Sequence, residues 1–450
     1  MDTFLVIAQL TVVLGCLLIG AHKGGMGLGL ISGIGLVILI FVFRLAPGEP
    51  PVSVMLTILA VVGSAASLQA AGGLDVMMRA AERILRAHPT RITLLGPLTT
   101  WTLTVLCGTG HVVYTMLPII ADISLGKGIR PERPMAVSAT ASQMGITASP
   151  VSVAVVSLAT ILAAEQGVGR AYSIPEILMI SVPASLSGVV LAALWSMRRG
   201  KELEDDEDFQ RRIADPEGRE YVYGGSTTLL DTTSPRSAYR AVALFFSGIA
   251  VVVLLGAFEG LRPTFMVDGE SEALSMNLAI QMMMLLSGAL ILLTSKPKAS
   301  AIAESAIFRA GTVAVFAVFG VAWMSETFFG AHIEGLEASL ADLVKTAPWT
   351  YAVALFLVSK LVNSQAAAVV AFVPVGLSLG VDTATVIGFF GAAYGYFVLP
   401  TYPSDLAAIG FDRSGTTRIG RYVINHSFLI PGLICVITSC AVGYGLSRFI

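Results

Sequence analysis

The chain has 450 residues, of which 55% are hydrophobic and 13% are charged, and its mean hydropathy is +0.80. About a quarter of the residues of a soluble domain are charged, so this composition excludes a soluble globular protein and predicts an all-α polytopic membrane protein. The formal net charge of -2 excludes little by itself, because the charges are distributed unevenly along the chain.

The first half of the chain alternates long apolar stretches with short polar ones. It predicts spans at 4–20, 26–43 and 52–70, a basic amphipathic helix at 74–91, interrupted apolar stretches at 93–123 and 135–164, and a final span at 174–196. The interruptions fall at 107–111 and 147–150. We interpret the charged segment 197–238 that follows as a solvated loop, with docking of a partner by its acidic run 202–208 as the alternative.

The second half repeats this order. It predicts spans at 239–258, 276–294 and 305–325, an amphipathic helix at 331–347, stretches 350–380 and 383–411 interrupted at 363–365 and 400–403, and a last span at 424–447. The offset between matching landmarks is nearly constant, at 254 from Thr109 to Asn363 and 253 from Pro150 to Pro403. Interrupted segments at matching positions of two halves indicate a transporter binding site.

Charge placement tests this layout. If 93–123 and 350–380 are re-entrant hairpins, each half has an odd number of full crossings, and the second half is inverted. With the N-terminus outside, 22 of the 28 lysines and arginines then lie in cytoplasmic segments, and Lys360 lies in the membrane. The positive-inside rule therefore favours hairpins, inverted repeats and two external termini together.

The repeats divide the chain into five predicted parts. These are scaffold helices at 1–92, a first hairpin, broken helix and final span at 93–196, a cytoplasmic linker at 197–238, scaffold helices at 239–348, and a second hairpin, broken helix and final span at 349–450.

The four breaks are the candidate binding site. A broken helix exposes free N–H groups and the positive end of its dipole, which bind anions without a dedicated charge. The predicted site residues are Thr109, Gly110, His111, Ser149, Pro150, Lys360, Asn363, Ser364, Gln365, Thr401, Tyr402, Pro403, Ser404 and Asp405. Four such ends near the midplane would suit a small molecule with two separated carboxylates. Proline kinks with self-satisfied hydroxyls are the alternative reading of each single break.

Three ionisable residues at membrane depth leave their roles open. Lys360 could pair with a substrate carboxylate or extend to the outer surface. Asp405 could hold a helix N-terminus, carry a coupling proton or pair with a cation. His111 could bind substrate, titrate near neutral pH or be structural.

Other classes of site find no support in the sequence. The four cysteines lie in apolar segments without metal spacing, and Gly25, Gly29 and Gly33 suit close packing of membrane helices. No nucleophile–base pair or phosphate loop stands out, and the helix at 74–91 is too short and mixed to indicate nucleic-acid binding. We therefore predict no enzyme activity, no cofactor, no metal and no nucleic-acid partner.

Several long motifs carry a family resemblance. They are KGGMGLGL, GGLDVM, CGTGHVVYT, IRPERPMA, SQMGITASPVSVAVVS, REYVYG, VNSQAA, LPTYPSDLAAI, FDRSGTTRIGR and NHSFLIPG. They resemble the Dcu family of bacterial anaerobic four-carbon dicarboxylate transporters, nearest to its B branch, whose hairpin carries GTGH. The match covers almost the whole chain except the segments near 165–175 and 259–275.

The resemblance implies exchange of fumarate, malate or aspartate for succinate across the inner membrane, and a possible sensor-kinase partner. Similarity to a wider group of ion transporters implies an elevator mechanism and a homodimer in the lipid bilayer. Two alternatives stay open: a carrier of citrate, gluconate or lactate with the same architecture, and a membrane dicarboxylate sensor.

Overall fold

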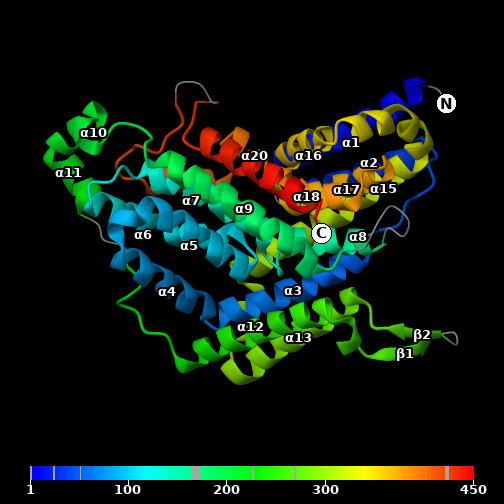
Figure 1. Ribbon diagram of the computed structural model, residues 1–450, viewed down its shortest axis with the longest axis horizontal. Coiled ribbons are helices and arrows are strands. Elements are labelled where there is room, and N and C mark those ends of the chain that lie inside the picture. Colours follow the sequence, from blue (N-terminus) through cyan, green and yellow to red (C-terminus); the bar gives the residue numbers. More distant parts are fainter. Residues whose placement is uncertain are drawn as a thin grey trace.

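The computed structural model describes residues 3–23, 26–50, 52–164, 172–224, 228–267, 270–400, 402–420 and 425–449, and most of this chain is helical (Figure 1). Seven of the described helical segments are long and apolar enough to cross a membrane. The prediction of a polytopic helical membrane protein is therefore confirmed.

The helices of the first half follow the predicted order. They are α1 (Thr3–Lys23), α2 (Gly27–Val37, continued by a π-helical segment Ile38–Val42), α3 (Val52–Ala70), α4 (Gly73–Ala87), α5 (Ile92–Cys107), α6 (Val113–Gly126), α7 (Glu132–Met144), α8 (Val153–Ala164) and α9 (Ile174–Ser196). The gaps between α5 and α6 and between α7 and α8 fall at the two predicted breaks. Each gap holds a 3₁₀ turn, Gly110–Val112 in the first and Gly145–Ala148 in the second.

The linker and the second half contain the remaining elements. They are α10 (Glu207–Ala214), α11 (Pro216–Tyr223), α12 (Arg236–Ala257), β1 (Thr264–Val267), β2 (Glu270–Ala273), α13 (Met276–Ser295), α14 (Ala299–Ala303), α15 (Ala306–Thr346), α16 (Trp349–Val362), α17 (Gln365–Ser378), α18 (Thr383–Gly388), α19 (Pro403–Phe411) and α20 (Leu429–Leu446). The gap between α16 and α17 falls at the predicted break.

One long helix replaces two predicted ones. The sequence predicts a span at 305–325 and a separate amphipathic helix at 331–347, but α15 runs through both. Near the end of the predicted span, α15 binds the loop before α3: Thr327 Oγ1 accepts a hydrogen bond from Gly48 N at 3.1 Å, and Trp323 Nε1 donates to Gly48 O at 2.6 Å. These contacts lie on the side of α15 and leave its backbone helical.

The second break in the C-terminal half is longer than predicted. The sequence places it at 400–403, but α18 ends at Gly388, and two 3₁₀ turns precede α19. The backbone of this stretch packs closely on its neighbours, because a Cβ at Gly395 would overlap the carbonyl oxygen of Phe356 in α16, and one at Gly391 would overlap Ser439 in α20.

Two segments predicted as loops contain secondary structure. In the linker, the Asp206 side chain accepts hydrogen bonds from Asp208 N and Phe209 N and so caps α10, while Asp215 caps α11. The predicted external loop near 259–275 contains the antiparallel β1–β2 hairpin. Figure 1 shows α10 and α11 at one end of the long axis of the molecule and the β-hairpin at the opposite end.

The layers of the molecule depend on close helix packing. α12 and α13 pack on each other and on α3, while α9 packs on α20 in a second layer (Figure 1). α2 meets α15 at two glycines, since a Cβ at Gly29 would overlap Phe316 O and one at Gly320 would overlap Gly29 O. In a lipid bilayer the hydrophobic effect does not drive helices together, so helix association depends on close van der Waals packing, which small residues allow.

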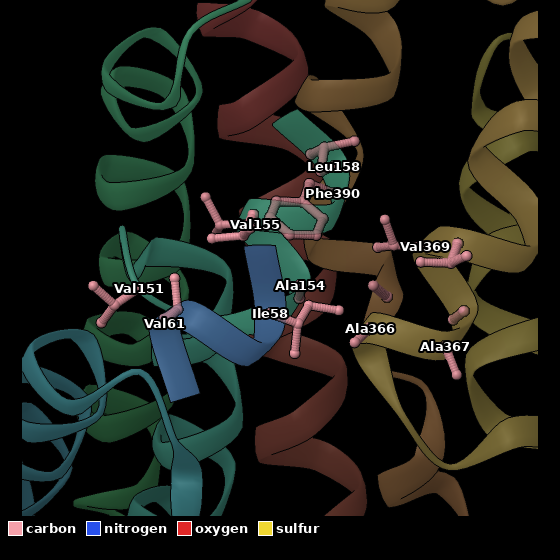
Figure 2. Close-up of a cluster of buried hydrophobic side chains, with 14 of the residues drawn as sticks. Ile58, Val61, Val151, Ala154, Val155, Leu158, Ala366, Ala367, Val369 and Phe390 are labelled. Carbon is pink, nitrogen blue, oxygen red and sulfur yellow. The ribbon is translucent and has the colours of Figure 1, made fainter. Parts of the chain in front are cut away.

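An apolar cluster connects the outer helices to the broken ones. Figure 2 shows side chains of α3, α8 and α17 meeting around Phe390. Ile58, Val155 and Leu158 are fully buried there. The cluster joins both halves of the chain, because α3 and α8 belong to the first half and α17 and Phe390 to the second. It therefore packs the broken helices of both halves against α3.

A group of charged and polar residues joins the linker to the start of α7 and to the loop before α20. This linker network consists of Arg130, Glu132, Arg199, Asp206 and Ser427. Glu132 accepts a hydrogen bond from Ser427 Oγ at 2.7 Å and forms ion pairs with Arg130 Nε at 2.9 Å and Arg199 Nη2 at 3.1 Å. Arg130 also pairs with Asp206, which connects α10 to the network.

Candidate functional site

A small cavity lies where the broken helices meet. Its volume is about 130 Å³, and its wall includes residues from all four breaks or from the helix ends beside them. The polar part of the wall contains Thr109, Gly110, His111, Tyr114, Gln143, Ser364, Gln365, Tyr396 and Tyr402. The breaks that the sequence singles out separately therefore converge on one space.

The first tip joins α5 to α6. The chain reverses at Gly108, whose φ of 72° favours glycine, and a Cβ there would lie 2.8 Å from Val151 O. Thr109 then caps the 3₁₀ turn, since its Oγ1 accepts a hydrogen bond from His111 N at 3.3 Å. Thr109 Oγ1 also lies 2.6 Å from His111 Nδ1. If the hydroxyl donates to Nδ1, the other ring nitrogen, Nε2, carries the proton and can donate to a ligand.

The second tip joins α16 to α17. Asn363 has φ 49°, in the left-handed region that asparagine tolerates better than most residues. Ser364 caps α17 by accepting a hydrogen bond from Ala367 N at 3.3 Å. This cap leaves the N–H groups of Gln365 and Ala366 at the positive end of α17, and both residues line the cavity.

Gln143 connects the two halves at the cavity wall. Its Oε1 accepts a hydrogen bond from the Tyr396 hydroxyl at 2.6 Å, and its main-chain carbonyl accepts one from Gln365 Nε2 at 2.8 Å. Gln143 belongs to the last turn of α7, Tyr396 lies before α19, and Gln365 opens α17. All three side chains are buried.

The cavity also has an aromatic part and an apolar wall. The rings of Tyr396 and Tyr402 lie 4.4 Å apart between centroids. An apolar part of the lining comes from helices outside the broken segments, namely Val61, Val62 and Ala65 of α3 and Ile307, Ala310 and Gly311 of α15. Figure 2 shows Val61 near Val151, and both line the cavity. The lining thus combines groups that can form hydrogen bonds with groups that offer only apolar contact.

Some predicted site residues lie behind the cavity wall. Lys360 Nζ donates to Asn363 Oδ1 at 3.2 Å and to Tyr396 O at 3.4 Å, so it braces the second tip. Ser149 is fully buried, and its Oγ accepts a hydrogen bond from Val151 N at 3.3 Å. Pro150 follows it in the turn before α8. None of these four residues belongs to the cavity wall of the described chain.

The residues that open α19 differ in position. Tyr402 lines the cavity, and Pro403 occupies the first turn of α19. Ser404 and Asp405 are buried, and neither the Ser404 hydroxyl nor the two Asp405 carboxylate oxygens have a hydrogen-bond partner among the described residues. Thr401 lies outside the described residues. Asp405 is therefore a buried ionisable group that accepts no hydrogen bond from the described residues and interacts electrostatically with Lys360.

Sequence reasoning missed Gln143, Tyr396 and Tyr114. A signal for the first two was present, because they are 253 residues apart, the same offset that separates Pro150 from Pro403. Applying the repeat offset to polar residues, as well as to prolines, would have paired them. For Tyr114 and the walls from α3 and α15 the sequence offers no such signal.

The site provides neutral donors and helix ends rather than metal ligands. The search of the described residues found no group of three or more His, Cys, Asp or Glu side chains that could hold a metal ion. Hydroxyls, amides and helix N-termini around a small cavity suit an anionic ligand. A polytopic helical protein with such a cavity between broken helices has the architecture of a membrane transporter.

Comparison with known proteins identifies the family. The model of the anaerobic C4-dicarboxylate membrane transporter family matches residues 5–450, so the chain belongs to this family. It is 55% identical to the anaerobic C4-dicarboxylate transporter DcuB of Escherichia coli O6:H1, over 97% of each chain. It is 34% identical to the C4-dicarboxylate transporter DcuA of Wolinella succinogenes, over 98% of each chain. The predicted resemblance to the B branch is confirmed, and the protein is a membrane transporter and not an enzyme.

A solved structure shares the fold. The structure of Neisseria gonorrhoeae MtrF, described as illuminating a class of antimetabolite efflux pumps, aligns with a TM-score of 0.57 and 14% identity. The alignment covers 92% of this chain and 85% of that one. At this identity the likeness concerns the fold alone.

Proposed function

We propose that this protein exchanges four-carbon dicarboxylates across the bacterial inner membrane, with fumarate, malate or aspartate entering and succinate leaving. The observation that carries the proposal is the cavity between the two tips, each of which ends in a capped helix start. Family membership and the 55% identity with DcuB support the substrate class.

The two tips would each hold one carboxylate. The first would use the Thr109–His111 turn, and the second would use the free N–H groups at the start of α17. Both interact with an anion through main-chain dipoles, each helix end being worth roughly half a positive charge. The hydroxyls of Tyr114 and Tyr402 are further neutral donors at the wall. A bound dianion would offset the positive helix ends, and we infer that the empty carrier crosses poorly for that reason.

Inverted repeats are supported by which helices pack together. α1 packs on α2 as α12 packs on α13, and α6 packs on α19 as α17 packs on α8. The two equivalent final helices, α9 and α20, pack on each other, and the equivalent residues Gln143 and Tyr396 share a hydrogen bond. Each pair is what a two-fold relation between the repeats would produce.

Re-entrant hairpins are supported by helix length. α5 has 16 residues, and α6, α16 and α17 have 14 each. At about 1.5 Å per residue they are shorter than the roughly 30 Å hydrocarbon core. We therefore propose the scaffold and moving parts at the boundaries 1–92, 93–196, 197–238, 239–348 and 349–450, with an elevator-type movement along the apolar wall from α3 and α15.

The same proposal includes orientation and partners. Both termini would be periplasmic, with α10 and α11 at the cytoplasmic face. The charge distribution of the sequence supports this orientation. A homodimer and contact with a membrane sensor kinase belong to the proposal as expectations from the resemblance to the family and its wider group.

Counterflow in proteoliposomes tests the function. Vesicles loaded with unlabelled succinate should accumulate labelled fumarate, and vesicles without internal dicarboxylate should not. Ser364→Ala, which removes the cap of α17 at the cavity, should lower the rate about tenfold. Ser378→Ala is the matched control, because Ser378 Oγ donates to Val375 O near the far end of the same helix.

The outcomes separate the alternatives. Accumulation that citrate, gluconate or lactate suppresses better than succinate would favour another organic-anion carrier. Equal uptake with and without internal dicarboxylate would contradict obligatory exchange. Binding of fumarate without any accumulation would favour a sensor.

A further inference from the structure

Gln143 touches both tips of the cavity. Through its main-chain carbonyl it accepts a hydrogen bond from Gln365 Nε2 at 2.8 Å, which fixes it to the second tip. On the other side, a Cβ placed on Gly110 of the first tip would lie only 2.7 Å from Gln143 Nε2 and 3.0 Å from Ser142 O. Gln143 therefore occupies the space between the two tips, and the first tip already lies as close to it as glycine permits.

The orientation of the Gln143 amide follows from its partners. Oε1 accepts the proton of the Tyr396 hydroxyl at 2.6 Å, and Nε2 donates to Ser142 Oγ at 3.1 Å. The side chain is 2% exposed, so it has no freedom to turn toward solvent. A buried amide whose oxygen and nitrogen are both hydrogen-bonded keeps a single orientation.

We propose that Gln143 is a positioning residue that sets the distance between the two tips and thereby the length of dicarboxylate that the site accepts. This inference rests on the proposed function, in which each tip holds one carboxylate. If the carboxylate sites are fixed on the tips, the spacing of the tips selects the number of carbons between the carboxylates. One methylene in a fitted pocket changes discrimination by about tenfold or more.

Two substitutions should move the spacing in opposite directions. Gln143→Asn keeps an amide but withdraws it by one methylene, which leaves room for the first tip to approach. Gly110→Ala adds a methyl group against Gln143 and Ser142 and pushes the first tip away. The first variant should favour a shorter diacid, and the second should favour a longer one.

The test is competition against labelled fumarate uptake in proteoliposomes by unlabelled malonate, succinate and glutarate. We expect wild-type protein to prefer succinate. Relative to succinate, inhibition by malonate should strengthen about tenfold in Gln143→Asn, and inhibition by glutarate should strengthen about tenfold in Gly110→Ala. Gln281→Asn is the control, because Gln281 makes its hydrogen bond to Thr57 in the outer layer and should leave both ratios unchanged.

Several results would overturn the inference. A merely structural role of Gln143 would lower uptake of all acids together and leave the inhibition ratios within twofold of wild type. Equal inhibition of wild type by the three acids would also overturn it. If Gln143→Asn does not fold, Gly110→Ala still tests the inference. The milder Tyr396→Phe removes one hydrogen bond to Gln143, and its effect is measured by the same inhibition ratios. Absence of any dicarboxylate uptake by wild type would overturn the proposed function and, with it, this inference.

Discussion

In the linker network, Glu132 is buried and receives three partners, whereas in the membrane Asp405 is equally buried and has no hydrogen-bond partner among the described residues. The same contrast holds for other residues of the two regions. Arg130 binds two carboxylates, while the hydroxyls of Tyr351 and Ser404 are buried without described partners. Buried polar atoms are normally hydrogen-bonded. The linker network follows this rule, and the region around Asp405 departs from it.

We interpret the linker network as a rigid structural contact and the polar groups around Asp405 as groups that act in transport. Satisfied charges stabilise one arrangement, because removing any member leaves another uncompensated. Unsatisfied groups raise the energy of the resting arrangement and are free to accept a ligand, a proton or a new neighbour. We expect the linker network to be structurally essential and the membrane polar groups to matter for transport more than for stability.

The largest effect should come from breaking the linker network. Glu132→Ala would remove the carboxylate that the buried Arg130 and the partly buried Arg199 share, and Arg130 would keep only one of its two carboxylates, so we expect a loss of about 3 kcal/mol in the free energy of unfolding. Thermal unfolding in detergent would measure it. Asp208→Ala is the control, since Asp208 is 66% exposed in its pair with Arg211 and should cost less than about 1 kcal/mol. Similar losses in the two variants would remove the distinction.

A smaller effect should follow from the backbone of the second tip. Asn363→Ala places alanine at φ 49° and removes the acceptor of the Lys360 hydrogen bond, which should cost about 1–2 kcal/mol. Asn363→Gly should recover the conformational part of that cost. Unfolding and fumarate uptake would be measured for both variants. If glycine and alanine behave alike, the left-handed conformation is not what the tip requires.

An opposite and smaller effect is expected where a buried hydroxyl has no partner. Tyr351→Phe removes the hydroxyl that no described group satisfies and keeps the ring that stacks on Phe372. We expect the protein to become more stable by up to about 1 kcal/mol. A clear loss of stability in the same unfolding assay would show that this hydroxyl has a partner in the membrane-embedded protein.

The smallest effect concerns pH at the linker. Burial tends to raise the pKa of Asp206, but hydrogen bonds from Arg130, Phe209 N and Asp208 N outweigh it and lower the pKa below its ordinary value of 3.8. A carboxyl with a lowered pKa stabilises the fold above its unfolded pKa, and this contribution is lost as the pH falls through the folded pKa. Wild type should therefore exceed Asp206→Asn in the free energy of unfolding at pH 7, by about 1 kcal/mol, and this advantage should vanish as the pH falls below 3.8. A difference that stays constant to low pH would mean that the charge of Asp206 is not responsible.

Much of the fold was predictable because the residues that interrupt its helices can be recognised from the local sequence. Glycine, asparagine and proline interrupt apolar stretches, and the breaks at Gly108–Gly110 and Asn363–Ser364 lie where these residues stand. The continuity of α15 was not predictable from the apolar pattern, because the Thr327 hydroxyl is hydrogen-bonded by the Gly48 loop, which lies 279 residues away in the chain. The length of the break before α19 was also not predictable, since Gly391 and Gly395 meet α20 and α16 only in the folded protein.

The location of the cavity was predictable from the sequence, and the composition of its wall was less so. Polar residues at the tips marked the cavity, since few other reasons place Thr109 or Ser364 within apolar stretches. Lys360 and Asn363 belong to the same tip but brace it from behind, and chain order cannot separate the two sides of a turn. Gln143 becomes recognisable only when both repeats are folded against each other.

The length of α15 has a consequence for the surrounding lipid. Its apolar part, Ala306–His332, has 27 residues and is about 40 Å long, while the hydrocarbon core measures roughly 30 Å. A helix that exceeds the bilayer must tilt or thicken the lipid around it. Because the first turns of α15 contribute Ile307, Ala310 and Gly311 to the cavity wall, a change in tilt would displace part of that wall. Acyl-chain length should therefore act on this carrier as a control of transport rate, even with every residue of the polar wall unchanged.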